Sequence, residues 1–163
     1  MVFILFISFI ILLRMLELFY SRRNEKWLVQ NGALEYGQKH YPFIVTLHVL
    51  FFISMIVEYL IFQPVSYNLF LLITYLILLI GKTWVILSLG KFWNVKIYHI
   101  PNVPPVKEGI YAYFKHPNYM IVVIEIAVIP LIFQLYYTAI VFTILNSIML
   151  FVRIREENKV LSI

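Results

Sequence analysis

The sequence predicts an all-α integral membrane protein: a bundle of five transmembrane helices, the last two forming a helical hairpin. Of the 163 residues, 63% are hydrophobic and only 13% are charged, which is more apolar surface than a soluble domain of this length can bury. Five apolar runs approach the roughly 20 residues that a spanning helix needs. They are Val2–Tyr20, Phe43–Phe62, Asn68–Leu89, Tyr119–Phe133 and Tyr136–Val152. Only Gln134 and Leu135 separate the last two runs, so we expect a tight turn between them.

The basic residues predict the orientation of this bundle. Lys and Arg side chains follow the first, third and fifth runs, whereas the connections 63–67 and 134–135 contain none. Because cytoplasmic loops are enriched in Lys and Arg, we expect the N-terminus outside and the C-terminus in the cytoplasm. Topology therefore accounts for the net charge of +5. A lipid membrane is the expected partner and nucleic acid is not.

Residues 1–163 are interpreted as a single domain in which several kinds of site are excluded. The chain has no cysteine, which rules out disulfides, thiolate zinc sites and a cysteine nucleophile. No metal-ligand set or serine–histidine–acid triad is visible, and five glycines are few for a Rossmann-type cofactor site. The first run lacks the basic flank and the cleavage site of a signal peptide. The sequence leaves the oligomeric state open.

Charged side chains inside the runs are expected to face the bundle, because exposing them to lipid is costly. Arg14 and Glu17 are three residues apart on one helical face and can pair. His48 and Glu58 are too far apart to touch within one helix. Glu125 lies in the fourth run between apolar neighbours. It either lines a substrate pocket or pairs with an arginine or histidine of another helix.

The most informative polar segment is EGIYAYFKHPNYM, residues 108–120. His116-Pro117 predicts the start of the fourth helix, because proline suits the first helical turn and restricts the residue before it. The free N–H groups of such a helix end attract anions. Nearby aromatic faces can hold a cation or stack on a planar base; they belong to Tyr111, Tyr113, Phe114 and Tyr119. An interfacial aromatic belt with snorkelling lysines is the alternative.

The tail FVRIREENKVL adds charge at the end of the fifth run. If the helix continues, Arg153 and Glu157 lie one turn apart on the same face. The short hairpin requires the start of the fourth run and the end of the fifth to lie close together. The sequence therefore predicts one site that combines a helix N-terminus, aromatic rings, a histidine, an arginine and carboxylates. An ordinary charged helix end is the alternative.

These two segments resemble the isoprenylcysteine carboxyl methyltransferase superfamily. GIYAYFKHPNY is similar to the pattern G-x-Y-x-x-x-R-H-P-x-Y, and RIREENKVL to R-x-x-x-E-E-x-x-L. Upstream, SRRNEKW, HYPFIVTLH and SLGKFWN look like the small bacterial branch. Some members of that branch O-methylate alkylpyrones made by type III polyketide synthases.

Two positions depart from the family pattern. Lys115 stands where the pattern has arginine, which keeps the charge but loses the bidentate fork. With Arg153 and Leu161 aligned, Glu157 takes the first glutamate position and Asn158 the second. A slip of one residue would instead make Glu156 and Glu157 the pair.

The resemblance implies that S-adenosylmethionine binds to a core of about residues 100–163. The implied cofactor-binding residues are Val103, Pro104, Pro105, Val106, Tyr111, His116, Pro117, Asn118, Tyr119 and Glu157. Arg153 is implied to face the methyl acceptor and, with Glu157, to be catalytic. Glu125 is a further candidate for contact with the substrate. The sulfonium suits tyrosine faces and the methionine carboxylate suits a helix N-terminus.

The implied activity is O-methylation, in the cell membrane, of a small lipophilic acceptor at a site facing the cytoplasm. The acceptor would enter from the bilayer and present a carboxylate or an enolic or phenolic hydroxyl, as in an alkylpyrone or an isoprenylcysteine-like group. Three alternatives remain: a phospholipid-type N-methyltransferase, a sterol-type reductase that uses a nicotinamide cofactor, and a membrane scaffold without enzymatic activity.

Overall fold

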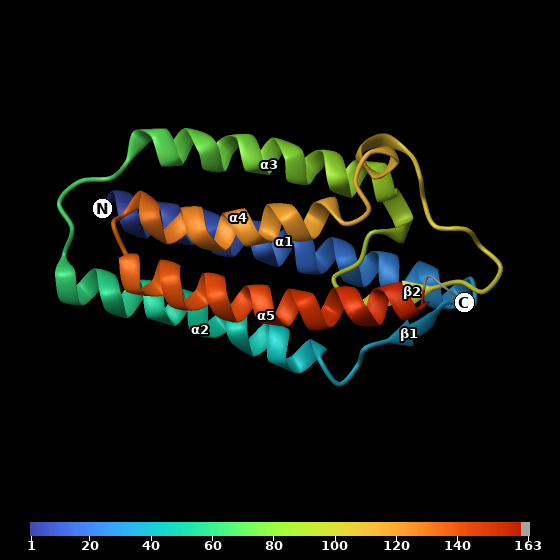
Figure 1. Cartoon of the computed structure of the whole chain (residues 1–163). Helices are drawn as coiled ribbons and strands as arrows, with labels where there is room; N and C mark the ends of the chain where they lie inside the picture. The colour runs from blue at the N-terminus through green and yellow to red at the C-terminus, as the bar shows by residue number, and fades with distance from the viewer. Residues whose placement is uncertain (161–163) are drawn as a thin grey trace.

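The computed structural model describes residues 1–160, in which five helices lie side by side and the termini lie at opposite ends of the bundle (Figure 1). The helices are α1 (Val2–Gln30), α2 (Tyr41–Phe62), α3 (Leu69–Leu89), α4 (Pro117–Ile132) and α5 (Tyr136–Val160). The all-α prediction is therefore confirmed. Leu161, one anchor of the tail alignment, lies outside the described residues.

Within residues 1–160, four helices are long and apolar enough to cross a membrane, namely α1, α2, α3 and α5. The fifth predicted span, α4, is a shorter apolar helix of 16 residues. At 1.5 Å per residue it is about 24 Å long, somewhat less than the hydrocarbon core of a bilayer. α4 nevertheless lies alongside the longer helices (Figure 1).

Two helices continue past the predicted spans. α1 extends beyond Tyr20 to Gln30, and α5 extends beyond Val152 to Val160. Hydropathy detects only the apolar part of a helix, whereas the backbone hydrogen bonds continue into the polar part. The predicted start of α4 at Pro117 is confirmed.

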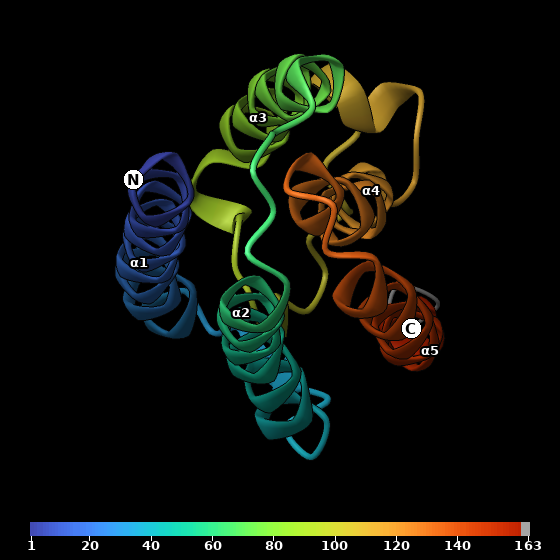
Figure 2. The same ribbon diagram turned by 90° about the vertical axis from the view of Figure 1, so that its left-hand side faces the viewer.

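The predicted hairpin of α4 and α5 is also confirmed. Its turn uses Gln134 in the left-handed region, with φ of 59°, and the Leu135 amide donates to the Pro130 carbonyl at 3.0 Å. Seen along the bundle, α4 lies between α3 and α5, and α2 lies beside α5 (Figure 2). The Glu58 carboxylate of α2 accepts hydrogen bonds from the first amides of α5, at 3.0 Å from Tyr137 and 2.7 Å from Thr138.

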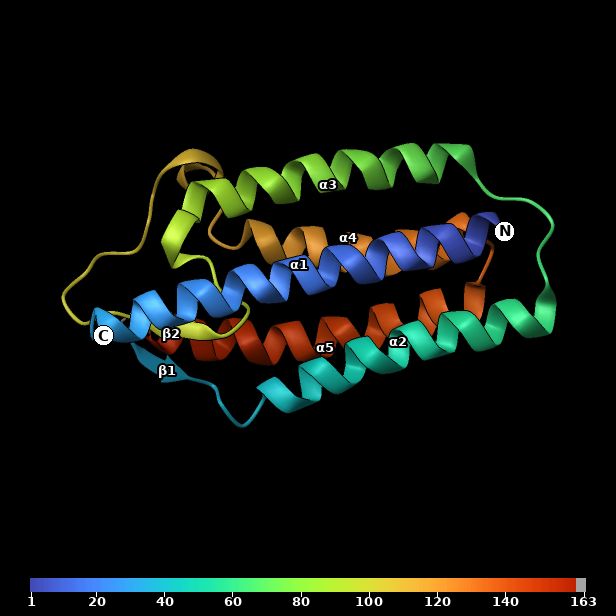
Figure 3. The same ribbon diagram turned by 180° about the vertical axis from the view of Figure 1, so that it is seen from behind.

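The end of the bundle formed by residues 31–40 and 90–116 is called the loop end below (Figure 3). Two strands here, β1 (Leu34–Tyr36) and β2 (Ile97–His99), pair antiparallel with Glu35 opposite Tyr98. Two 3₁₀ turns, η1 (Gly90–Phe92) and η2 (Gly109–Ala112), complete it. The strands were not predicted, because three residues are too few for a period-two pattern to be recognised.

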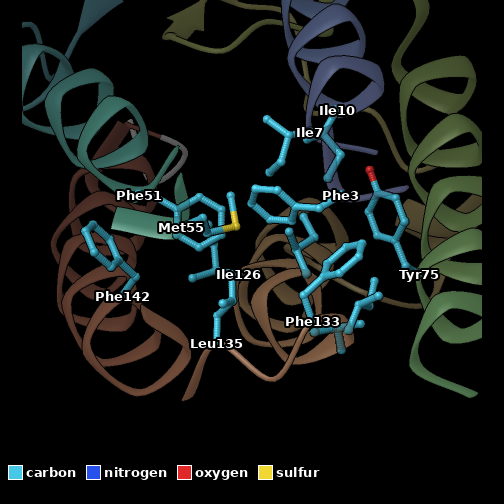
Figure 4. Packing of buried hydrophobic residues seen from close by; sticks show 13 residues of the cluster. Phe3, Ile7, Ile10, Phe51, Met55, Tyr75, Ile126, Phe133, Leu135 and Phe142 are labelled. Atoms are coloured by element: carbon cyan, nitrogen blue, oxygen red, sulfur yellow. The ribbon is translucent and has the colours of Figure 1, made fainter. Parts of the chain in front are cut away.

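The apolar core lies towards the other end of the bundle, where the side chains converge from several helices (Figure 4). The Phe3 ring stacks on Tyr59 with centroids 3.7 Å apart and meets Phe133 edge-on at 5.1 Å. Such aromatic pairs add to the stabilisation from area burial. This core packs around the hairpin turn, and a second, smaller apolar cluster around Val85, Trp93 and Ile121 reaches the loop end.

Candidate functional site

The hairpin brings the start of α4 against the end of α5. The Tyr119 hydroxyl donates a hydrogen bond to Glu157 Oε2. His116 stacks on Tyr119, and its Nδ1 lies 3.8 Å from Glu157 Oε1. His116 Nε2 lies 3.2 Å from Asn158 Oδ1. The four residues that the sequence placed on two separate motifs thus form one contiguous group.

Arg153 lies one helical turn before Glu157 and holds the other side of Tyr119. Its Nε donates to the Tyr119 hydroxyl at 2.9 Å, and its Nη2 donates to the Val95 carbonyl. The guanidinium also lies over the Tyr119 ring, 5.5 Å from the centroid. Tyr119 therefore bridges the two α5 side chains: its hydroxyl accepts a hydrogen bond from Arg153 and donates one to Glu157.

A cavity of about 620 Å³ lies beside this group at the loop end. Residues 103–107 and 111–115 form much of its wall, and Glu157 reaches it from α5. Of the predicted cofactor-binding residues, Val103, Pro104, Pro105, Val106, Tyr111 and Glu157 line the cavity. His116, Pro117, Asn118 and Tyr119 are not part of the wall. His116 and Tyr119 instead contact Glu157 directly, as described above.

The polar lining of the cavity carries both signs of charge. Glu157 is its carboxylate, and Lys107 and Lys115 supply ammonium groups. Burial and the negative charge of Glu157 raise the pKa of Tyr111, so its hydroxyl is neutral and remains a donor at physiological pH. The cavity thus offers donors, an acceptor and aromatic faces within one volume.

Part of the wall comes from residues that were not predicted. Leu28 of α1, Leu89 of α3 and Phe92 line the cavity, as does Tyr98 of β2. Burial and hydrogen bonds to Glu25 and Glu35 raise the pKa of Tyr98. No local pattern identifies these residues, because α1 and β2 reach the cavity only through the tertiary fold.

Residues 70–163 match the model of the isoprenylcysteine carboxyl methyltransferase (ICMT) family. The matched segment contains α3, the cavity wall and the hairpin. The chain belongs to the ICMT family. Its members are membrane methyltransferases that use S-adenosylmethionine, which agrees with the long apolar helices described above.

Two relatives match along nearly the whole chain. A Bacillus subtilis (strain 168) protein, described as uncharacterized protein YpbQ, is 44% identical over 96% of this chain and 95% of its own. A Haemophilus influenzae (strain ATCC 51907 / DSM 11121 / KW20 / Rd) protein, described as uncharacterized, is 32% identical over 94% of this chain and 91% of its own. No solved structure matches the chain.

The two neighbouring glutamates of the tail, between which the two registers differ, have different surroundings in this ICMT-family chain. Glu157 lines the cavity and accepts from Tyr119. Glu156 is not part of that wall and pairs instead with Lys159 at 2.7 Å. Asn158, which the alignment on Arg153 and Leu161 would put at the second glutamate position, lies beside His116.

Glu125 lies apart from the cavity in this ICMT-family chain. It is fully buried, and its Oε2 accepts from Arg14 at 2.8 Å and from Lys82 at 3.1 Å. Glu17 pairs with the same two cations, at 2.8 Å and 3.0 Å. The predicted Arg14–Glu17 pair is confirmed and forms part of this four-residue ion cluster, which joins α1, α3 and α4. Pairing with arginine, one of the two interpretations of Glu125, is the arrangement found.

His48 also has a local partner. Its Nδ1 lies 2.9 Å from the carbonyl of Ile44, one turn earlier in α2. Neither His48 nor Glu58 lines the 620 Å³ cavity.

Proposed function

We propose that this chain is an S-adenosylmethionine-dependent O-methyltransferase that acts on a small lipophilic acceptor at the cytoplasmic face of the cell membrane. The supporting observation is the single cavity that residues 103–106, Tyr111 and Glu157 share. These residues come from two motifs far apart in the sequence. A volume of about 620 Å³ lies within the range typical of small-molecule sites.

The residues around the cavity fit the cofactor chemically. Tyr98, Tyr111 and Tyr113 offer faces for a sulfonium or an adenine ring. Lys107 and Lys115 suit a carboxylate, and Glu157 suits an ammonium or ribose hydroxyls. When bound, S-adenosylmethionine supplies an electrophilic methyl group on its sulfonium.

In the proposed reaction, the protein mainly positions groups and excludes water. Tyr119 holds Glu157 at the cavity, and Arg153 holds Tyr119. Within residues 1–160, Arg153 uses Nε and Nη2 for these structural hydrogen bonds, and Nη1 makes none. Arg153 lines a separate small hollow and not the wall of the 620 Å³ cavity. In the proposal, Nη1 is the donor to the acceptor oxygen. An anionic carboxylate or enolate needs no strong base, so alignment is the main contribution.

The proposed orientation and entry route follow from charge and hydropathy. Residues 90–116 carry Lys91, Lys96, Lys107 and Lys115, which favours the cytoplasm for the loop end. Leu28, Leu89 and Phe92 give the cavity an apolar side near the helix ends. An acceptor from the bilayer, such as an alkylpyrone or an isoprenylcysteine-like molecule, would approach along that side.

Calorimetric titration of the purified protein with S-adenosylmethionine tests the cofactor. We expect saturable binding that Glu157→Ala weakens at least about tenfold, the loss of one charge-assisted hydrogen bond. His116→Ala should also weaken it, because His116 lies against Glu157 at the cavity. Mass spectrometry of lipid extracts incubated with protein and cofactor then identifies the product. An O-methylated lipophilic product supports the proposal, and an N-methylated head group would replace it with a phospholipid-type N-methyltransferase. Absence of binding would favour a scaffold.

A further inference from the structure

The backbone carbonyl of Val95 is a structural partner of Arg153. Because this acceptor is a backbone atom, its position depends on the contacts that hold segment 90–96 in place. That segment follows α3 and precedes β2. The hydrogen bonds that hold this segment therefore bear on the position of the Arg153 guanidinium.

Ser21 of α1 and Asn94 form a reciprocal set of hydrogen bonds that fixes this segment. The Ser21 hydroxyl donates to Asn94 Oδ1 at 3.0 Å, and Asn94 Nδ2 donates back to the Ser21 carbonyl at 3.1 Å. The Val95 amide donates to Ser21 Oγ at 3.1 Å. Asn94 Oδ1 also accepts from the Lys96 amide at 2.8 Å. The peptide group that contains the Val95 carbonyl and the peptide group before it are thus both restrained.

Asn24, one turn further along α1, holds the start of the same segment. Its Nδ2 donates to the Trp93 carbonyl at 2.7 Å and to the Gly90 carbonyl at 3.0 Å. Ser21 and Asn24 are 1% and 4% exposed. Buried polar side chains that are fully committed to one partner segment order it, and leaving them unpaired is costly.

We propose that Ser21, Asn24 and Asn94 are positioning residues for Arg153, an assignment that rests on the proposed function. Through the Val95 carbonyl, α1 sets the orientation of the guanidinium that meets the acceptor oxygen. α1 lies outside residues 70–163, the segment that matches the family model. Ser21 and Asn24 belong to SRRNEKW, a segment that resembles the small bacterial branch, and the role proposed for them rests on the three-dimensional contacts.

A small hollow lies beside the Arg153 side chain. It has a volume of about 10 Å³ and is lined by Arg153, Lys96 and His40, among others. A volume of about 10–15 Å³ admits one water-sized group. This hollow shares no lining residue with the 620 Å³ cavity. The inference therefore concerns the orientation of Arg153 itself, since a displacement of about 1 Å can slow a reaction about 100-fold.

The test compares Ser21→Ala and Asn94→Ala with Ser54→Ala in the full-length protein. Ser54→Ala removes a similar hydrogen bond between helices, to Thr138 at 2.7 Å, remote from the loop end. Turnover is measured with radiolabelled S-adenosylmethionine and a lipid extract of the producing cells, and cofactor affinity by calorimetry. Hydrogen exchange of the Val95 and Lys96 amides reports on the hydrogen bonds that hold this segment, without reference to activity.

We expect Ser21→Ala and Asn94→Ala to lower kcat about 10- to 100-fold while the cofactor Kd changes less than about twofold. Exchange at Val95 and Lys96 should accelerate, and Ser21→Thr, which keeps the hydroxyl, should restore kcat. Ser54→Ala should alter none of these values. Equal losses of kcat and cofactor affinity, or faster exchange with unchanged kcat, would overturn the positioning role. If the wild-type protein neither binds cofactor nor methylates lipid, the proposed function itself fails.

Discussion

Tyr119 of α4 and Glu157 of α5 are hydrogen-bonded across the hairpin, with the tyrosine hydroxyl as donor. The pair links the helix that begins at Pro117 to the polar end of α5, and Glu157 carries the contact to the cavity. A hairpin turn at one end of the bundle thereby fixes a carboxylate at the other. The following predictions concern this pair and its surroundings.

Glu157 and Glu156 provide a matched comparison because they are adjacent but differently placed. Glu157→Gln should weaken S-adenosylmethionine binding about tenfold or more, since it removes a charged acceptor at the cavity. Glu156→Gln should leave the affinity unchanged, because its pair with Lys159 is exposed. Calorimetric titration of both variants decides between the two registers of the tail motif. A loss of affinity in both variants would favour the slipped register, in which Glu156 and Glu157 are the pair.

The stability of the fold should depend more on the charge balance of the ion cluster than on its number of ion pairs. Glu125→Ala leaves Arg14 and Lys82 with Glu17 as their anion, and losing one partner of a buried pair costs about 3–5 kcal/mol. Replacing both Lys82 and Glu125 with methionine keeps the interior neutral and should be milder. Thermal unfolding in detergent measures the difference. A double variant less stable than Glu125→Ala would contradict this account.

Gly109 should resist substitution for two separate reasons. Its φ is 56°, and a Cβ added there would lie 2.9 Å from the Ser88 Cβ of α3. Gly109→Ala should therefore displace η2, which carries Tyr111, and weaken cofactor binding. Gly90 has a φ of 52° but nothing within 4 Å of an added Cβ. Gly90→Ala separates backbone strain from the clash, and it should affect binding less when both variants are titrated with cofactor.

Tyr111 should make stability depend on alkaline pH. Because burial and Glu157 raise its pKa, the folded protein keeps this proton above about pH 10, where the unfolded chain has released it. Its contribution is complete below that pH and is lost as the pH rises through the folded-state pKa. Spectrophotometric titration of tyrosinate should show a group of late-titrating tyrosines that includes Tyr98 and Tyr111, with one fewer in Tyr111→Phe.

A second variant tests the cause of that shift. Glu157→Gln removes the negative charge and should move the titration of Tyr111 towards lower pH. An unchanged titration curve would show that burial alone is responsible.

Short sequence patterns predicted the hairpin and the meeting of the start of α4 with the end of α5. The two-residue break at Gln134 and Leu135 implied the turn, and His116-Pro117 marked the start of α4. Because a hairpin fixes which helix ends meet, these short-range signals placed His116 near Glu157. The continuation of α5 past Val152 was only a condition of this prediction, because the apolar run ends there, and the structure shows that the helix continues to Val160.

Contacts between distant segments could not be predicted in the same way. Glu125 pairs with Arg14 of α1 and Lys82 of α3, and no spacing of residues within α4 predicts either partner. The pairing of β1 with β2 joins three-residue segments across α2 and α3. Leu28 reaches the cavity only because α1 continues as a helix past its apolar part.

The neutral ion cluster has a consequence for biosynthesis. The ribosome delivers Arg14 and Glu17 first, then Lys82, and Glu125 only when α4 emerges. A nascent chain halted after α3 therefore holds the two cations of the cluster, Arg14 and Lys82, against the single anion Glu17, and the charges of the cluster balance only once α4 has been made.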